Sequence, residues 1–295
     1  MRISRKDRWQ EAGMLAPALI LLVVVTLVPF ALSIWFSFTD QRLVPRPIPT
    51  KFVGVTNYQR MFADPDFWQA IWNTVYFAVL VVPFQLAISL AAALALNSLI
   101  PARGFFRSVA MLPLLLPLTV VVAIWAVLFR IPNGPLNAAW QLFAGQGNYV
   151  DWIGSSSTAM ISFVVLSAWA TFPYQMLIYL AGLQEIPREL YEAAKVDGAT
   201  SWQRFRSVTW PGLRNVNIFL LIITTIGALK LFTQVNILSK GGPNGATTTI
   251  ILYLFQQGFT AQKIGFASAV AVFFFLAVTA IALLQRAFLK NEAVR

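Results

Sequence analysis

Long apolar runs separated by short polar segments make up most of this chain. A helix needs about 20 apolar residues to cross the hydrocarbon core of a bilayer. Six runs reach that length, at about 14–38, 71–96, 107–129, 158–182, 216–238 and 264–288. The pattern therefore predicts an all-α membrane protein with six transmembrane helices, and the chain shows no internal repeat.

The first run follows several basic residues, as the apolar stretch of a signal peptide does. It is too long for a signal peptide and has no clear small-residue cleavage site, so we expect an uncleaved first span. The predicted organisation is a cytoplasmic tail (1–13), a first helix with an external loop (14–70), a five-helix core (71–290) and a second tail (291–295).

Lysine and arginine predict the orientation of the chain, because cytoplasmic loops carry an excess of them. With both termini inside, fourteen of these residues lie on the cytoplasmic side and seven outside. Four of the seven outer charges lie in the 39–70 loop, which weakens the contrast. We expect both termini to be cytoplasmic.

Composition restricts the chemistry. Only 11% of the 295 residues are charged, against about 25% in soluble domains, and there is no cysteine or histidine. Thiolate nucleophiles, imidazole bases and their metal sites are therefore excluded, and we expect no catalytic residue, metal or cofactor. The net charge of +11 lies at the ends of apolar runs, which indicates membrane topology rather than nucleic-acid binding.

All six runs lack carboxylates. No Asp or Glu occurs between Asp66 and Asp151 or between Asp197 and Glu292, and the first and fourth runs contain none either. Proton-driven transporters normally use an ionisable group within the membrane. There is no glycine-rich Lys-Ser/Thr loop for a nucleotide phosphate either. A partner must therefore supply the energy for any uphill transport.

The polar segment 183–215 lies between the fourth and fifth runs. Glu189, Glu192 and Asp197 alternate there with Arg188 and Lys195, which predicts a short water-exposed helix. A glycine at 198 is typical of a helix end. The segment is either an ordinary solvated loop helix or a helix that docks on another protein.

The spacing favours docking. Glu192-Ala193-Ala194, three residues, Gly198, nine residues and Val208-Thr209-Trp210-Pro211 resemble the EAA signature of permease subunits of binding-protein-dependent ABC importers. The family pattern ends Ile-x-Leu-Pro, so Val208 and Trp210 depart from it. The resemblance implies that 188–202 is a coupling helix, with Glu192 facing a cytoplasmic ATPase and Gly198 making a bend. The implied coupling residues are Arg188, Glu189, Glu192, Ala193, Ala194, Asp197, Gly198 and Pro211.

Three further stretches resemble the carbohydrate branch of that family, exemplified by maltose and glycerol-3-phosphate importers. They are 52–58, 238–248 and the Pro113/Pro117 pair, and the resemblance covers about 14–290. It implies the type I permease fold in a bacterial or archaeal cytoplasmic membrane. It also implies three partners: a second homologous permease, of which this chain is the first of the pair, a cytoplasmic ATPase dimer and an extracytoplasmic solute-binding protein.

The implied function is ATP-driven import of a sugar or sugar-like solute. A secondary transporter or channel without an ATPase is the alternative, and a membrane-embedded enzyme is a third possibility that the missing catalytic groups disfavour. Relatives hold sugar at positions resembling Thr171, Tyr174, Gln175, Thr224, Ala228 and Leu231.

Polar residues within the spans suggest where a solute passes. We expect Pro173 to interrupt the fourth span, and helical spacing places Thr224, Ala228, Leu231 and Val235 on one face. The candidate pathway residues are Thr171, Tyr174, Gln175, Thr224, Lys230 and Gln234.

Two sets of residues leave alternatives open. Lys230 either reaches the outer interface or the sister permease, or contacts a polar or anionic solute. Trp125, Trp169 and Tyr174 either stack on a sugar ring or face the core and lipid.

Overall fold

The computed structural model describes residues 5–44, 47, 49–98 and 102–291. Parts of the two expected tails, residues 1–4 and 292–295, lie outside this described portion. The described residues form helices joined by loops, with one isolated β-bridge between Thr39 and Phe52. It forms two compact units, one of Met1–Phe67 with Tyr253–Ala277 and the other of Trp68–Leu252 with Val278–Arg295.

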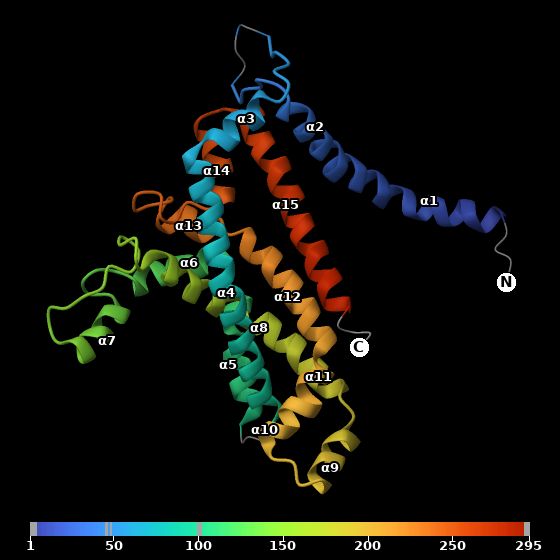
Figure 1. Cartoon of the computed structure of the whole chain (residues 1–295), viewed down its shortest axis with the longest axis vertical. Coiled ribbons are helices and arrows are strands. Elements are labelled where there is room, and N and C mark those ends of the chain that lie inside the picture. Colours follow the sequence, from blue (N-terminus) through green and yellow to red (C-terminus); the bar gives the residue numbers. More distant parts are fainter. Residues whose placement is uncertain (1–4, 45–46, 48, 99–101, 292–295) are drawn as a thin grey trace. The chain divides into compact units, whose positions relative to one another are not determined.

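The apolar runs become helices, as expected (Figure 1). Among the described residues, five helical stretches are long and apolar enough to cross a membrane, and there are six if a bent pair counts as one span. The five are Met14–Ser37, Pro65–Asn97, Ala159–Glu185, Arg214–Leu238 and Ile264–Ala287. They comprise α1 (Arg5–Leu22), a π-helical turn (Val23–Leu27), α2 (Val28–Ser37), α4 (Pro65–Asn97), α8 (Ala159–Glu185), α12 (Arg214–Leu229), α13 (Thr233–Leu238) and α15 (Ile264–Asn291).

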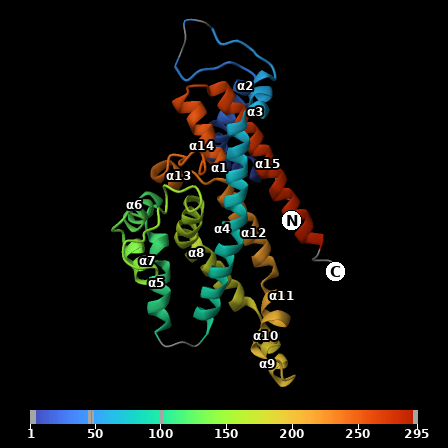
Figure 2. The ribbon, with the colours of Figure 1, turned by 60° about the vertical axis from the view of Figure 1, so that its left-hand side comes forward.

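The prediction of one continuous third helix over 107–129 is wrong. The run forms α5 (Arg103–Leu115) and α6 (Leu118–Leu128), which are bent by 101°. Pro117 causes the break, because its ring disfavours helical backbone at the preceding residue, and Leu116 accordingly has an extended ψ of 135°. Figure 2 shows α6 turning away from α5 toward α7 (Pro135–Ala144).

The expected interruption at Pro173 is also wrong, because α8 continues through this residue from Ala159 to Glu185. A buried proline removes one backbone hydrogen bond, and packed neighbouring helices tolerate that loss in a membrane span. The fifth run does break instead. Helix α12 ends at Leu229, and Phe232 has a non-helical φ of −141° before α13 begins.

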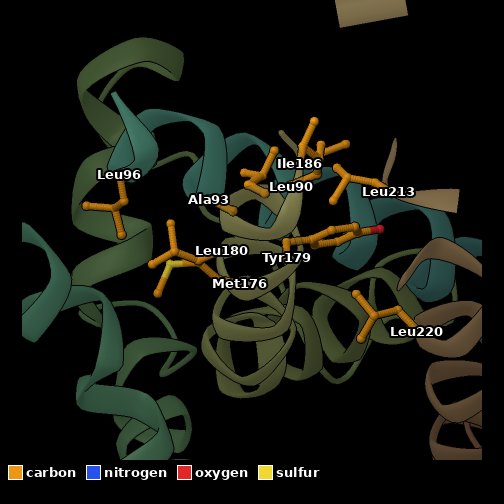
Figure 3. Packing of buried hydrophobic residues seen from close by; sticks show 10 residues of the cluster. Leu90, Ala93, Leu96, Met176, Tyr179, Leu180, Ile186, Leu213 and Leu220 are labelled. Carbon is orange, nitrogen blue, oxygen red and sulfur yellow. The ribbon is translucent and has the colours of Figure 1, made fainter. Parts of the chain in front are cut away.

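The core of the larger unit lies where α4, α8 and α12 meet (Figure 3). Its buried members are Leu90, Ala93, Leu96, Met176, Tyr179, Leu180, Leu183, Ile186, Leu213 and Leu220. Close approach of the helices requires Gly182, since a Cβ there would lie 2.6 Å from a Val216 methyl group. Small residues allow such contacts between membrane helices.

The smaller unit comprises α1, α2, α3 (Thr56–Ala63), the start of α4, the first half of α15 and the chain from Tyr253 that precedes it. The expected short helix near 57–62 is therefore present as α3. The buried Asn57 amide donates to the carbonyls of Ser37 and Thr39 at 2.9 and 2.8 Å. The Tyr253 hydroxyl donates to Asp64 at 2.6 Å, and burial together with this carboxylate raises the pKa of Tyr253.

Candidate functional site

The charged segment forms two short helices rather than one helix over 188–202. Helix α9 covers Arg188–Val196 and α10 covers Ser201–Arg204. Gly198 has a φ of +74°, a conformation that favours glycine, and its N–H donates to the Lys195 carbonyl at 3.0 Å. The expected bend at Gly198 is thus present.

A capping box starts the second of these helices. Gln203 N–H donates to the Thr200 hydroxyl, and the Gln203 side chain accepts from Thr200 N–H at 2.7 Å. A π-helical turn (Phe205–Thr209) and α11 (Trp210–Gly212) then lead into α12. The chain is therefore helical from α10 almost continuously into a membrane span.

Helix α9 lies at one end of the larger unit, beyond α8 and α11 (Figure 1). Its outward face follows helical spacing, with Glu189, Glu192, Ala193 and Val196 all exposed. The Val196 side chain is 88% exposed. The outward face of α9 therefore presents acidic and apolar side chains together.

One aromatic residue holds α9 against the rest of the unit. The Tyr191 hydroxyl lies 3.0 Å from the Thr209 hydroxyl, and its ring packs on the core that includes Leu213. Tyr191 is not among the residues predicted from the sequence. The feature that could have identified it in the sequence is that Tyr191 is the one aromatic residue of α9, whose other residues are charged or aliphatic.

The remaining predicted coupling residues lie around this helix. Arg188, Asp197 and Pro211 are exposed, whereas Ala194 is half-buried. A groove of about 530 Å³ adjoins the bend and is lined by Asp197, Gly198, Ala199, Gln203, Arg206 and Ser207.

A second feature of the larger unit is a cavity of about 450 Å³ between its helices. Residues of α4, α6, α8 and α12 and of the link to α13 line it. All six predicted pathway residues reach this cavity: Thr171, Tyr174, Gln175, Thr224, Lys230 and Gln234. Ala228 and Leu231 line it too, but Val235 is buried elsewhere because the helix breaks before it.

Two of these residues also connect helices. Gln175 is buried; its carbonyl oxygen accepts from the Ser89 hydroxyl at 3.0 Å, and its amide donates to the Thr224 hydroxyl at 2.9 Å. These bonds join α4, α8 and α12. Thr171 and Tyr174 differ, since both are exposed to the cavity and Thr171 bonds only within its own helix, to the Ser167 carbonyl at 2.7 Å.

Lys230 supplies the positive charge of the cavity wall. It caps the carboxyl end of α12, where its N–H donates to the Gly227 carbonyl at 3.1 Å, and its side chain is exposed. A lysine within a span costs about 2.5–3.5 kcal/mol on insertion scales. The exposed side chain faces the cavity rather than the packed interior of the bundle.

Trp125 and Trp169 pack in a hydrophobic cluster of the core rather than at a position where they could stack on a sugar. Trp125 is 7% exposed and its ring lies 5.9 Å from that of Trp169 and 5.0 Å from that of Phe129. Neither tryptophan lines the cavity, whereas Tyr174 does. The described side chains also contain no group of three or more carboxylates that could hold a metal ion.

Comparison with known proteins identifies the class. The model of the family described as "Binding-protein-dependent transport system inner membrane component" matches residues 85–292. Among curated relatives, the "Trehalose/maltose transport system permease protein MalF" of Thermococcus litoralis is 34% identical over 281 residues, which cover 94% of this chain and 93% of the relative.

Two further comparisons agree. The "Sulfoquinovosyl glycerol transport system permease protein SmoG" of Agrobacterium fabrum is 35% identical over 290 residues, or 95% of this chain and 93% of the relative. A crystal structure of a bacterial ABC transporter involved in the import of the acidic polysaccharide alginate matches 97% of this chain and 96% of its own, with a TM-score of 0.81 and 22% identity. That structure supports the fold alone.

These findings define a multi-pass membrane protein with the type I fold of ABC importer permeases. The chain belongs to the family of binding-protein-dependent transport system inner membrane components, in the branch that contains the maltose-type permeases. It is the permease subunit of an ATP-driven importer, and in this family ATP hydrolysis is carried out by a separate subunit.

Proposed function

We propose that this permease carries a sugar or sugar-like solute and that α9 couples it to a cytoplasmic ATPase. The names of the two relatives support the sugar class, since they include trehalose, maltose and sulfoquinovosyl glycerol. The exposed face of α9 carries the coupling proposal. This face carries acidic and apolar side chains, and α10 and α11 connect α9 to the membrane helix α12.

The contacts of α9 define how the coupling works. Glu192, Ala193 and Val196 face outward and contact the ATPase, while Tyr191 and its bond to Thr209 transmit force to the start of α12. Gly198 sets the angle between α9 and α10. Arg188, Glu189, Ala194, Asp197 and Pro211 complete the coupling surface.

The solute passes through the cavity between α4, α8 and α12. Exposed hydroxyls of Thr171 and Tyr174 are suited to sugar hydroxyl groups, and Gln234 offers an amide. Gln175 and Thr224 contribute to the wall while holding the helices together. Alternating access opens this cavity to one side of the membrane at a time as α9 moves.

The assembly follows from the same proposal. A second homologous permease, an ATPase dimer and an extracytoplasmic solute-binding protein complete the importer. Both termini and α9 lie in the cytoplasm of a bacterial or archaeal cell, which agrees with the excess of Lys and Arg on that side. The chain itself holds no cofactor.

The test is a charge reversal on α9 in the complete importer reconstituted in proteoliposomes. Glu192→Lys should lower solute-stimulated ATP hydrolysis and uptake at least tenfold, because it places a cation in a contact selected for an acid. Glu185→Lys is the matched control, since Glu185 is an exposed acid at the end of α8 outside the coupling surface. Wild-type rates in Glu192→Lys would refute the coupling role of this face.

A further inference from the structure

The cavity wall carries charge of one sign. Among the described residues that line it, Lys230 is the one charged side chain, and no Asp or Glu faces it. The helices that form the wall offer no alternative, since the sequence has no acid from 67 to 150 or from 198 to 291 and α8 has one only in its last residue, Glu185. The wall therefore contains a cation without a fixed counterion.

The position of Lys230 makes its charge available to a solute. The helix break after Leu229 places it at the cavity wall, and its side chain is exposed rather than folded into the bundle. Low-dielectric walls focus the field of such a charge into the space that they enclose. Lys230 also lies at the carboxyl end of α12, where the helix dipole favours a nearby cation.

From this arrangement we infer that the solute is an anionic sugar or polyol derivative, and that its negative group binds Lys230. This inference rests on the proposed function and specifies its substrate class. A carboxylate, sulfonate or phosphate supplies the missing counterion, while the hydroxyls of Thr171 and Tyr174 bind the neutral part of the molecule. A neutral sugar would leave the ammonium group without a partner in the cavity.

The chain has no cysteine, which permits a direct measurement of the cavity potential. Thr171→Cys places one thiol in the same cavity as Lys230. The experiment uses the complete importer, with reactive cysteines removed from the other subunits. The thiol is treated separately with an anionic reagent, sulfonatoethyl methanethiosulfonate, and with a cationic one, its trimethylammonioethyl analogue. The measured quantity is the ratio of the anionic to the cationic reaction rate. Tyr174→Cys, also exposed to the cavity, provides a second reporter should Thr171→Cys fail to assemble.

Lys230→Gln should lower that ratio about tenfold, as expected for removal of one nearby charge acting oppositely on the two reagents. Lys240→Gln is the control, because Lys240 lies outside the cavity wall, and it should change the ratio less than twofold. A ratio that does not respond to Lys230→Gln would overturn the inference, since a carboxylate of the sister permease would then already neutralise the lysine. Unreactive thiols in every nucleotide state would overturn it as well.

Uptake with matched probes tests the substrate class. Proteoliposomes with the cognate binding protein are offered neutral sugars and their acidic counterparts. The sets are glucose with glucuronate and glucose 6-phosphate, and galactose with galacturonate. An acidic probe should be carried, and its uptake should fall at least tenfold in Lys230→Gln and recover in Lys230→Arg. Uptake of neutral probes alone would overturn the anionic class and leave the proposed function intact. A binding protein that binds no sugar, with no ATP-driven uptake, would refute the proposed function itself.

Discussion

The Gln175 bridge yields a prediction whose size follows from its contacts. Gln175→Met keeps the length of the side chain but removes both hydrogen bonds that connect α8 to Ser89 and Thr224. Ser89 keeps other acceptors, the carbonyls of Gln85 at 2.6 Å and Phe172 at 3.2 Å, so the substitution leaves it satisfied.

Hydrogen bonds between membrane helices average about 0.6 kcal/mol and reach about 1.7 kcal/mol. Losing two should therefore destabilise the permease by about 1–3 kcal/mol. Thr224→Val removes one bond and leaves the buried amide of Gln175 without an acceptor, which should cost about 1–3 kcal/mol. Because the two residues share one bond, the double variant should show a coupling energy of about 0.6–1.7 kcal/mol.

Steric trapping of the purified permease in nanodiscs measures these free energies of unfolding. Thr171→Val is the control, since the Thr171 hydroxyl bonds only to its own helix, and it should change stability by less than about 0.5 kcal/mol. If the free-energy losses of Gln175→Met and Thr224→Val simply add in the double variant, the hydrogen bond between these side chains is not formed in the membrane. That result would contradict a role for this bond in packing α8 on α12.

Three further predictions concern other contacts. Gly182→Ala should cost about 1–3 kcal/mol because its Cβ meets the Val216 side chain, and Val216→Ala in the same chain should restore part of this loss in a steric-trapping measurement. Gly198→Ala should cost about 1–2 kcal/mol through its positive φ alone, since nothing lies within 4 Å of the added Cβ, and stability equal to wild type would contradict that backbone conformation. Tyr253→Phe should lower the melting temperature by removing the bond to Asp64, worth about 1.5–3 kcal/mol for a charged acceptor, whereas an unchanged melting temperature would contradict the bond.

The sequence predicts the apolar helices well but not their breaks. Run length and composition identify each span, because the bilayer imposes a minimum length on any helix that crosses it. Pro117 and Pro173 are both prolines within apolar runs, yet the first breaks its helix and the second does not. The two prolines differ in packing, since Pro173 is buried and Pro117 is exposed, and packing partners are not visible in a single sequence.

The candidate site is also only partly predictable from the sequence. The local pattern predicts a short charged helix that ends at Gly198, because a glycine with positive φ is a local feature of the chain. It does not predict that 188–202 divides into α9 and α10. The double role of Gln175 could not be predicted, since Ser89 and Thr224 lie 86 and 49 residues away in sequence. The cavity that joins Thr171, Lys230 and Gln234 likewise depends on the break between α12 and α13.

Cross-linking of α9 in the assembled importer tests the central claim most directly. Ala193→Cys adds one thiol to the exposed face of a chain that has none, and Gly104→Cys, on α5 outside the coupling surface, is the control. A short bifunctional thiol reagent should join Ala193→Cys to single-cysteine variants of the ATPase, with a yield that changes when ATP is bound. Failure of Ala193→Cys to cross-link to the ATPase in any nucleotide state, in a complex that still transports, would contradict the account.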